Sequence, residues 1–118
     1  MEKDFSIKQM KSALLAVDIK MTAAQRMMLT GHYQHRVAST EKIARCGGYR
    51  TYSAGNLQYG ILCGRIASEL GFVPPRSKIY AIATVSNKRD DEGHFQWRMD
   101  SIVRKAIEEL GWAEKSTT

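Results

Sequence analysis

The stretch Thr40-Glu-Lys-Ile-Ala-Arg-Cys-Gly-Gly-Tyr-Arg-Thr-Tyr-Ser-Ala-Gly-Asn-Leu-Gln-Tyr-Gly-Ile-Leu-Cys-Gly-Arg-Ile-Ala-Ser-Glu-Leu-Gly-Phe72 decides the expected fold. It predicts a short helix that Thr40 caps, a glycine-containing turn over 47–52, and a longer helix over about 54–70 that Ser53 caps. Two helices joined in this way outline a helix-turn-helix, which presents a helix to DNA. The turn is longer than the three to four residues of the simplest helix-turn-helix.

The longer helix has one broad apolar face, made by Tyr59, Leu62, Cys63, Ile66, Ala67 and Leu70. Gly60 and Gly64 lie beside this face, one turn apart. Because each glycine costs a helix about 1 kcal/mol, we expect a neighbouring backbone to approach closely there. The helix is therefore predicted to be the mostly buried spine of the core. It would meet a partner with its first turn and with a narrow strip at Gln58 and Arg65.

Capping signals predict two helices ahead of this unit. Ser6 precedes apolar residues at helical spacing over about 7–17. The run Thr22-Ala-Ala-Gln25 is a capping box that opens a second helix over about 23–33. A polar connection over 32–38, with room for short extended structure, then leads to the helix-turn-helix unit.

A β-hairpin and a last helix are predicted after the unit. Residues 78–86 are rich in β-branched and aromatic residues, as is typical of a strand. Residues 94–99 return with alternating apolar side chains, beyond a charged tip. Following a helix-turn-helix, such a hairpin is placed like a wing. Asp100 is expected to cap a final helix over 101–110.

The expected fold class is α+β, mainly helical and winged helix-turn-helix-like, with one β-hairpin and a C-terminal helix. The 118 residues favour a single domain, 1–118, with a core over about 7–112. Within it the helix-turn-helix-like unit spans 40–72, the hairpin 78–99 and the C-terminal helix 101–110.

Composition favours an anionic partner. Eighteen Lys+Arg against twelve Asp+Glu give a net charge of +6, which suits nucleic acid, although ordinary basic solubility remains the alternative. The two cysteines, Cys46 and Cys63, have no metal-ligand spacing and are expected to be small buried groups in a reducing cytoplasm. The N-terminal sequence has no apolar signal core, and no apolar run reaches about 18 residues. We therefore expect neither secretion nor a membrane span.

No motif for catalysis, for a metal or for a cofactor stands out. We therefore expect a non-enzymatic protein that holds neither a metal nor a cofactor. His32 and His35 are three apart, but no Cys, Asp or Glu close in sequence completes a metal site. The acidic cluster Asp90–Glu92 with His94 lies on the predicted hairpin tip, where carboxylates are usually solvated.

The basic residues are distributed for binding rather than for reaction. Arginine and lysine neutralise phosphates, and Asn, Gln and Arg pair with base edges. The candidate DNA-contacting residues are Lys42, Arg45, Arg50, Ser53, Asn56, Gln58, Arg65 and Lys88. Asn56 has an equal alternative, which is to pin the preceding turn by hydrogen bonds. At the tip, the neighbouring carboxylates would oppose a phosphate contact by Lys88.

A family resemblance points the same way. The run Tyr49 to Leu70, with Tyr52-Ser-Ala-Gly-Asn-Leu-Gln-Tyr-Gly60, resembles a small domain found ahead of HNH nuclease domains in bacterial proteins. The ending Trp97-Arg-Met99 through Glu108-Glu-Leu-Gly-Trp112 is similar too, so the resemblance covers most of the chain after Met21. It implies DNA targeting in restriction or mobile-element settings. Since no nuclease motif appears before Thr118, we expect only the binding module to carry over.

Three functional hypotheses follow. The first is binding of double-stranded DNA, as a bacterial or phage regulator or DNA-targeting module. The second is a small phage or mobile-element protein that inhibits or recruits a host protein complex. The third is RNA binding, because basic and aromatic residues interleave over 49–52. The oligomeric state is open in all three.

Overall fold

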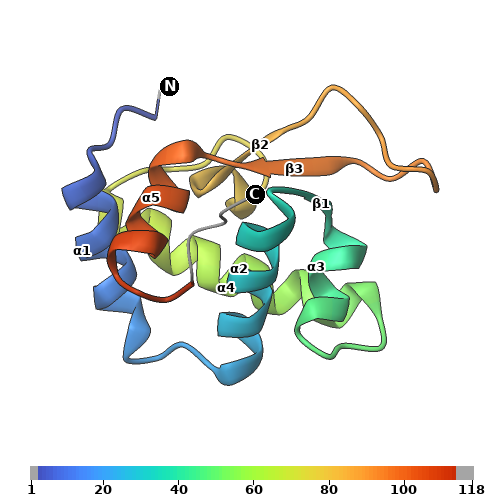
Figure 1. Cartoon of the computed structure of the whole chain (residues 1–118), viewed down its shortest axis with the longest axis horizontal. Helices are drawn as coiled ribbons and strands as arrows, with labels where there is room; N and C mark the ends of the chain where they lie inside the picture. Colours follow the sequence, from blue (N-terminus) through green and yellow to red (C-terminus); the bar gives the residue numbers. More distant parts are fainter. Residues whose placement is uncertain (1–2, 114–118) are drawn as a thin grey trace.

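Five α-helices, one 3-10 helix and three strands make up residues 3–113, the part of the chain that the computed structural model describes (Figure 1). The elements are α1 (Ile7–Asp18), α2 (Ala23–His35), β1 (Val37–Ser39), α3 (Thr40–Cys46), α4 (Tyr52–Leu70), η1 (Lys78–Ala81), β2 (Ala83–Val85), β3 (Gln96–Met99) and α5 (Ser101–Glu109). The expected α+β class, mainly helical, is confirmed.

The first two helices begin at the predicted caps. In α1 the Ser6 hydroxyl accepts the Gln9 N–H at 3.1 Å, and the Gln9 side chain accepts the Ser6 N–H at 2.8 Å. Thr22 and Gln25 form the same reciprocal pair at the start of α2. However, α2 continues to His35, so the predicted polar connection over 32–38 is wrong in its first half. The helix continues because His32 is a buried core residue with two hydrogen-bond partners.

The caps of α3 and α4 differ from the predicted ones. Ser39 caps α3 by accepting the Lys42 N–H at 3.1 Å, while Thr40 is the first helical residue and bonds Glu41 instead. Thr51 caps α4 by accepting the Ala54 N–H at 3.3 Å. The predicted cap Ser53 therefore lies in the first turn of α4 and is exposed. In each case two hydroxyl residues lie close together, and the extended backbone decides which one caps.

The three strands form one antiparallel sheet in the order β1-β3-β2. The predicted hairpin is present, but β3 lies between β2 and a third strand, β1. The predicted strand over 78–86 is wrong in its first half, where η1 replaces it, and the returning strand begins at Gln96 rather than at residue 94. Ile79, Ala81 and Ile82 are all buried. Alternation would turn Ile82 away from the other two in a strand, whereas in the 3-10 turn Ile79 and Ile82 share one side.

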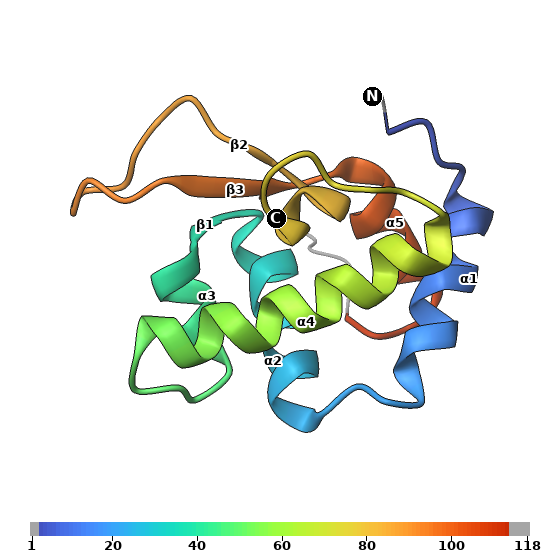
Figure 2. The ribbon, with the colours of Figure 1, turned by 180° about the vertical axis from the view of Figure 1, so that it is seen from behind.

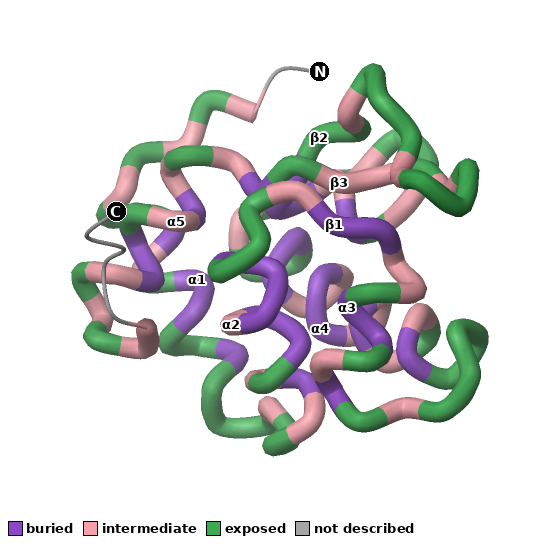
Figure 3. The backbone as a smooth tube through the Cα atoms, turned by 45° about the vertical axis from the view of Figure 1, so that its right-hand side comes forward, coloured by how far each residue is buried: buried purple, intermediate pink, exposed green. Residues whose placement is uncertain are grey.

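The core lies between α4 and the remaining elements. Figure 2 shows α4 running the width of the molecule, with α3 beside its first half and η1 and α1 beside its second half. Its buried residues are Gly55, Tyr59, Leu62, Cys63, Ile66 and Ala67, so the predicted role as spine of the core is confirmed. Figure 3 shows the burial concentrated on the inner sides of α1, α2 and α4, with exposed backbone in the hairpin and in the loops between helices. Of the two cysteines, Cys63 is buried but Cys46 is only half-buried.

The predicted close approach at Gly60 and Gly64 is wrong. A Cβ at Gly60 would meet nothing within 4 Å, and one at Gly64 would meet only the flexible Lys78 side chain, at 3.0 Å. The close approach is at Gly55, where a Cβ would lie 2.7 Å from the Ala44 Cα and closer still to the Ala44 Cβ. The absence of a side chain at Gly55 thus allows α3 and α4 to pack backbone to backbone.

The last helix, α5, ends at Glu109, one residue earlier than predicted. Asp100 is its N-cap residue but makes no side-chain cap, because its carboxylate bonds Lys3 at 2.8 Å and Thr84 at 3.0 Å. Of the helices within residues 3–113, none combines the length and the apolar character needed to cross a bilayer.

Candidate nucleic-acid interface

Three of the predicted basic residues gather at α3 and the turn after it. Lys42 and Arg45 are exposed and lie about one turn apart on α3, and Arg50 is exposed in the turn before α4. Burial raises the pKa of the Cys46 thiol, and the charges of Lys42 and Arg45 oppose that rise, so both cations lie near this thiol. Within residues 3–113, none of the three cations forms an ion pair with a carboxylate.

The turn that carries Arg50 is built by the backbone. The N–H of Gly48 donates to Arg45 O at 3.0 Å, and the N–H of Tyr49 donates to Ala44 O at 3.1 Å. Gly48 has φ +81°, a left-handed conformation that glycine adopts without a Cβ penalty. Asn56 is half-buried and makes no side-chain hydrogen bond to any described residue. No side-chain hydrogen bond from Asn56 to a described residue of this turn therefore supports its alternative role of pinning the turn.

His94, in the loop of the hairpin, lies between carboxylates of α3 and of the same loop. Its Nε2 lies 3.4 Å from Glu41 Oε2, and its Nδ1 lies 3.5 Å from Asp90 Oδ2. Asp90 Oδ1 also accepts the N–H groups of Glu92 and His94. The His94 N–H is the main cause of a lowered pKa of the Asp90 carboxyl. The Asp90 carboxylate thus organises the loop of the hairpin.

Lys88 is the exposed cation of the hairpin tip. Its own N–H donates to the Ser86 hydroxyl at 3.3 Å, while its ammonium group is exposed. The neighbouring Arg89 closes the tip, because its guanidinium donates to Gly93 O at 2.8 Å and lies 4.0 Å from the centre of the Phe95 ring. Exposed carboxylates at Asp91 and Glu92 lie on the same tip, as the sequence indicated.

Two of the predicted DNA-contacting residues, Gln58 and Arg65, lie apart from this group. The Gln25 side chain, itself buried, donates to Gln58 O at 3.2 Å and to Gln58 Oε1 at 3.4 Å. Arg65 donates to Lys20 O at 3.3 Å. Both residues therefore join α4 to the start of α2 and to the link before it. Lys42, Arg45, Arg50 and Ser53 follow one another along α3, the turn after it and the first turn of α4, and all four are exposed, whereas Gln58 and Arg65 lie on another edge of α4.

Sequence reasoning missed two exposed arginines near this group, Arg36 and Arg98. Arg36 follows α2 directly, and Arg98 lies on the face of β3 opposite Trp97 and Met99. The alternation over 94–99 contained the signal for Arg98, since a strand that turns Trp97 and Met99 inward turns Arg98 outward. Nothing in the sequence pattern marks Arg36.

His32 occupies the centre of a buried polar link between α2, α4 and β3. Its Nδ1 lies 2.7 Å from the Tyr59 hydroxyl and its Nε2 lies 2.9 Å from Trp97 O. A carbonyl only accepts, so Nε2 carries the proton and Nδ1 accepts from Tyr59. Burial lowers the pKa of His32 to about 4. Both ring nitrogens are thus engaged, and the described residues contain no group of three or more potential ligands that could hold a metal ion.

Protonation of His32 should make folding stability depend on pH. The folded pKa of about 4 lies below the value of about 6.5 expected in the unfolded chain, so the unfolded state binds more protons between these values. Stability is then fully present above pH 6.5 and falls by about 3 kcal/mol as the pH approaches 4. Urea unfolding at pH 7.5, 6.0 and 5.0 measures the loss. An NMR titration of the folded protein that places the His32 midpoint near 6.5 would contradict this account.

A scan against protein-family models and searches of curated proteins and of solved structures found no match to the chain.

Proposed function

We propose that this chain is a non-enzymatic protein that binds double-stranded DNA through a winged helix-turn-helix arrangement. In this proposal α3 and α4 are the helix-turn-helix and the β2–β3 hairpin is the wing. The observation that carries the proposal is the group of exposed cations at Lys42, Arg45 and Arg50. They lie on the helix and turn that lead into the N-terminus of α4, where phosphate is also favoured by the helix dipole.

The placement of the hairpin supports this arrangement. The Glu41–His94 contact brings the loop of the hairpin beside the first turn of α3. Figure 1 shows the hairpin tip reaching out on the same side of the molecule as α3 and the start of α4. Lys88 at the tip is the proposed phosphate contact of the wing, and Ser53 and Asn56 are the proposed base contacts of α4. The proposed setting is that of a bacterial or phage regulator or DNA-targeting module in the cytoplasm.

A specific observation favours a second candidate, a protein that binds and inhibits or recruits a host complex. The first half of the outer face of α4 carries no charged group, and consists of Ser53, Leu57, Gly60 and Ile61, whereas the Lys78 side chain lies beside Gly64 farther along. The Leu57 side chain is 61% exposed, although a helix that reads a groove normally presents polar side chains. An uncharged, apolar helix face suits a protein surface better than DNA.

A binding series with two probes tests the proposal. Fluorescence anisotropy is measured with a random-sequence DNA duplex, a structured RNA and no nucleic acid competitor, at 50 and 200 mM salt. Four phosphate contacts, from Lys42, Arg45, Arg50 and Lys88, predict that duplex affinity falls roughly 150-fold between these salt concentrations. The absence of duplex binding at 50 mM salt would contradict the proposal and favour the protein partner. Tighter binding of the RNA than of the duplex would also contradict it.

A further inference from the structure

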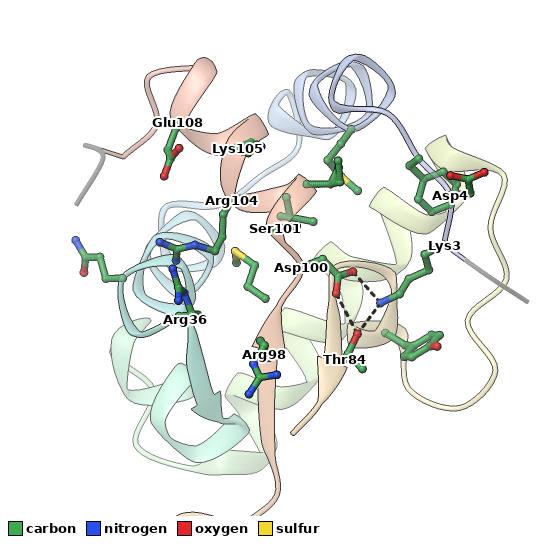
Figure 4. A pocket seen from close by; sticks show the side chains of 17 residues that line it. Lys3, Asp4, Arg36, Thr84, Arg98, Asp100, Ser101, Arg104, Lys105 and Glu108 are labelled. Carbon is green, nitrogen blue, oxygen red and sulfur yellow. Dashed lines mark hydrogen bonds and ion pairs between the residues drawn. The ribbon is translucent and has the colours of Figure 1, made fainter. Parts of the chain in front are cut away.

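A broad groove lies beside the proposed interface, between the segment before α1, the end of α2, the outer face of the sheet and α5 (Figure 4). Its volume is about 1420 Å³. Small-molecule sites have volumes of roughly 300–1,000 Å³ and enclose their ligands. The size of this groove therefore suits part of a polymer better than a small ligand.

The groove has a surplus of positive charge. Five cationic side chains and three carboxylates line it: Lys3, Arg36, Arg98, Arg104 and Lys105, with Asp4, Asp100 and Glu108. Two of the carboxylates are engaged within the fold. Asp100 bonds Lys3 at 2.8 Å, and Glu108 accepts the Tyr33 hydroxyl at 2.6 Å.

Three of the cations remain without a carboxylate partner among the described residues: Arg36, Arg98 and Lys105. All three are exposed. Arg104, by contrast, donates to Tyr33 O and lies over the Tyr33 ring. In Figure 4 the side chains of Arg36 and Arg104 point toward one another, while the bonds of Asp100 lie on the other side of the groove. Like charges that converge in this way favour an anion between them.

The backbone of Arg36 has a conformation that an arginine does not favour. Its φ is 62° and its ψ is −50°, and it is the one residue other than glycine with a positive φ within 3–113. Its N–H donates to His32 O at 2.8 Å and its carbonyl accepts the Met99 N–H at 2.8 Å, so both backbone groups are fixed. Glycine would fit this position without strain. Folding therefore does not explain the arginine, and its exposed guanidinium is the remaining reason for it.

The groove continues the basic surface of α3. Burial and then the charge of Lys42 lower the pKa of His35, which places Lys42 near the last turn of α2. Arg36 follows His35 directly, and β1 pairs Val37 with Arg98. The cations thus follow one another from α3, past the end of α2, to β3.

We propose that this groove binds the phosphodiester backbone of duplex DNA beyond the segment that α3 contacts. Arg36, Arg98 and Lys105 are its phosphate contacts. This inference rests on the proposed DNA-binding function and extends the same interface. It assigns the strained arginine and the groove a single role.

The test uses two triple variants of equal charge. The groove variant is Arg36→Gln, Arg98→Gln and Lys105→Gln. The control is Lys8→Gln, Lys20→Gln and Arg76→Gln, three exposed cations outside the groove. Anisotropy with a random-sequence duplex of about 25 base pairs is measured at several salt concentrations. The groove variant should bind roughly 10- to 100-fold more weakly at 150 mM salt, with a log–log salt slope smaller by about 2–3. The control should stay within about threefold of the parent protein.

Two results would overturn the inference in different ways. If the parent protein binds DNA and the groove and control variants behave alike, the groove is not part of the interface, and the proposed function stands. If the parent protein does not bind the duplex at low salt, both the groove inference and the proposed function are wrong. Arg36→Gly separates binding from folding, because it should raise the melting temperature by roughly 2–6 °C while weakening DNA binding. A lower melting temperature would contradict the strain argument for Arg36.

Discussion

Replacing Lys42, Arg45 and Arg50 together by glutamine is expected to reduce the affinity for duplex DNA about 100-fold at 150 mM salt. The three side chains are exposed and without carboxylate partners among the described residues, so their loss removes phosphate contacts without breaking an ion pair. The slope of log affinity against log salt should fall by about 2.7, since each phosphate contact contributes about 0.9. Circular dichroism checks that the variant is folded.

The matched control for this variant is Gln58→Ala with Arg65→Gln. These residues were expected from the sequence to face DNA, but they bond Gln25 and Lys20 within the fold. Affinity of the control should stay within about threefold of the parent protein. If the control loses as much affinity as the triple variant, the interface lies on the Gln58–Arg65 edge and not at α3.

Gly55→Ala is expected to destabilise the protein by about 3 kcal/mol, the upper part of the usual range for overpacking. The new methyl group would lie 2.7 Å from the Ala44 Cα, a backbone atom that cannot rotate away. The helices α3 and α4 would have to separate, and with them the turn that carries Arg50. Chemical unfolding in urea measures the change.

Gly60→Ala on the same helix is the control for this second variant. Nothing lies within 4 Å of its added Cβ, so the better helix propensity of alanine should stabilise the protein by about 0.5–1 kcal/mol. Equal losses of stability in the two variants would show that glycine is needed in α4 for a reason other than the packing of α3.

The sequence predicted most helices and the inward face of α4, because capping boxes and helical periodicity are local signals. The Ser6–Gln9 and Thr22–Gln25 pairs and the Tyr59–Ile66 face are of this kind. Which glycine meets a neighbour is not local. Gly55 and Gly60 both lie in one helix, and only the position of α3 distinguishes them.

The region 78–82 shows a second limit. Its β-branched and aromatic residues suit a strand, yet burial of Ile79, Ala81 and Ile82 together is satisfied by a 3-10 turn packed on α4. Tertiary packing thus overrides local propensity there. The strand β1 is only three residues long and depends on its pairing with β3.

The sequence identified the exposed cations of α3 and of the turn after it, but not every contact of the other candidate residues. Lys42, Arg45, Arg50 and Ser53 lie together because they follow one another through a single turn. For Gln58 and Arg65, a helical wheel identifies an outward edge but not their bonds to Gln25 and Lys20, which depend on the packing of a neighbouring segment. Arg36 escaped notice because a positive φ in arginine has no sequence signature.

The link from His32 to Tyr59 and Trp97 has a consequence for recognition. It fixes the base of the hairpin to the two helices beneath it, through a neutral imidazole with both nitrogens occupied. A partner that contacts both the hairpin and α4 therefore meets a preorganised surface. Little conformational entropy is lost in orienting that surface on association, so more of the contact free energy is expressed as affinity.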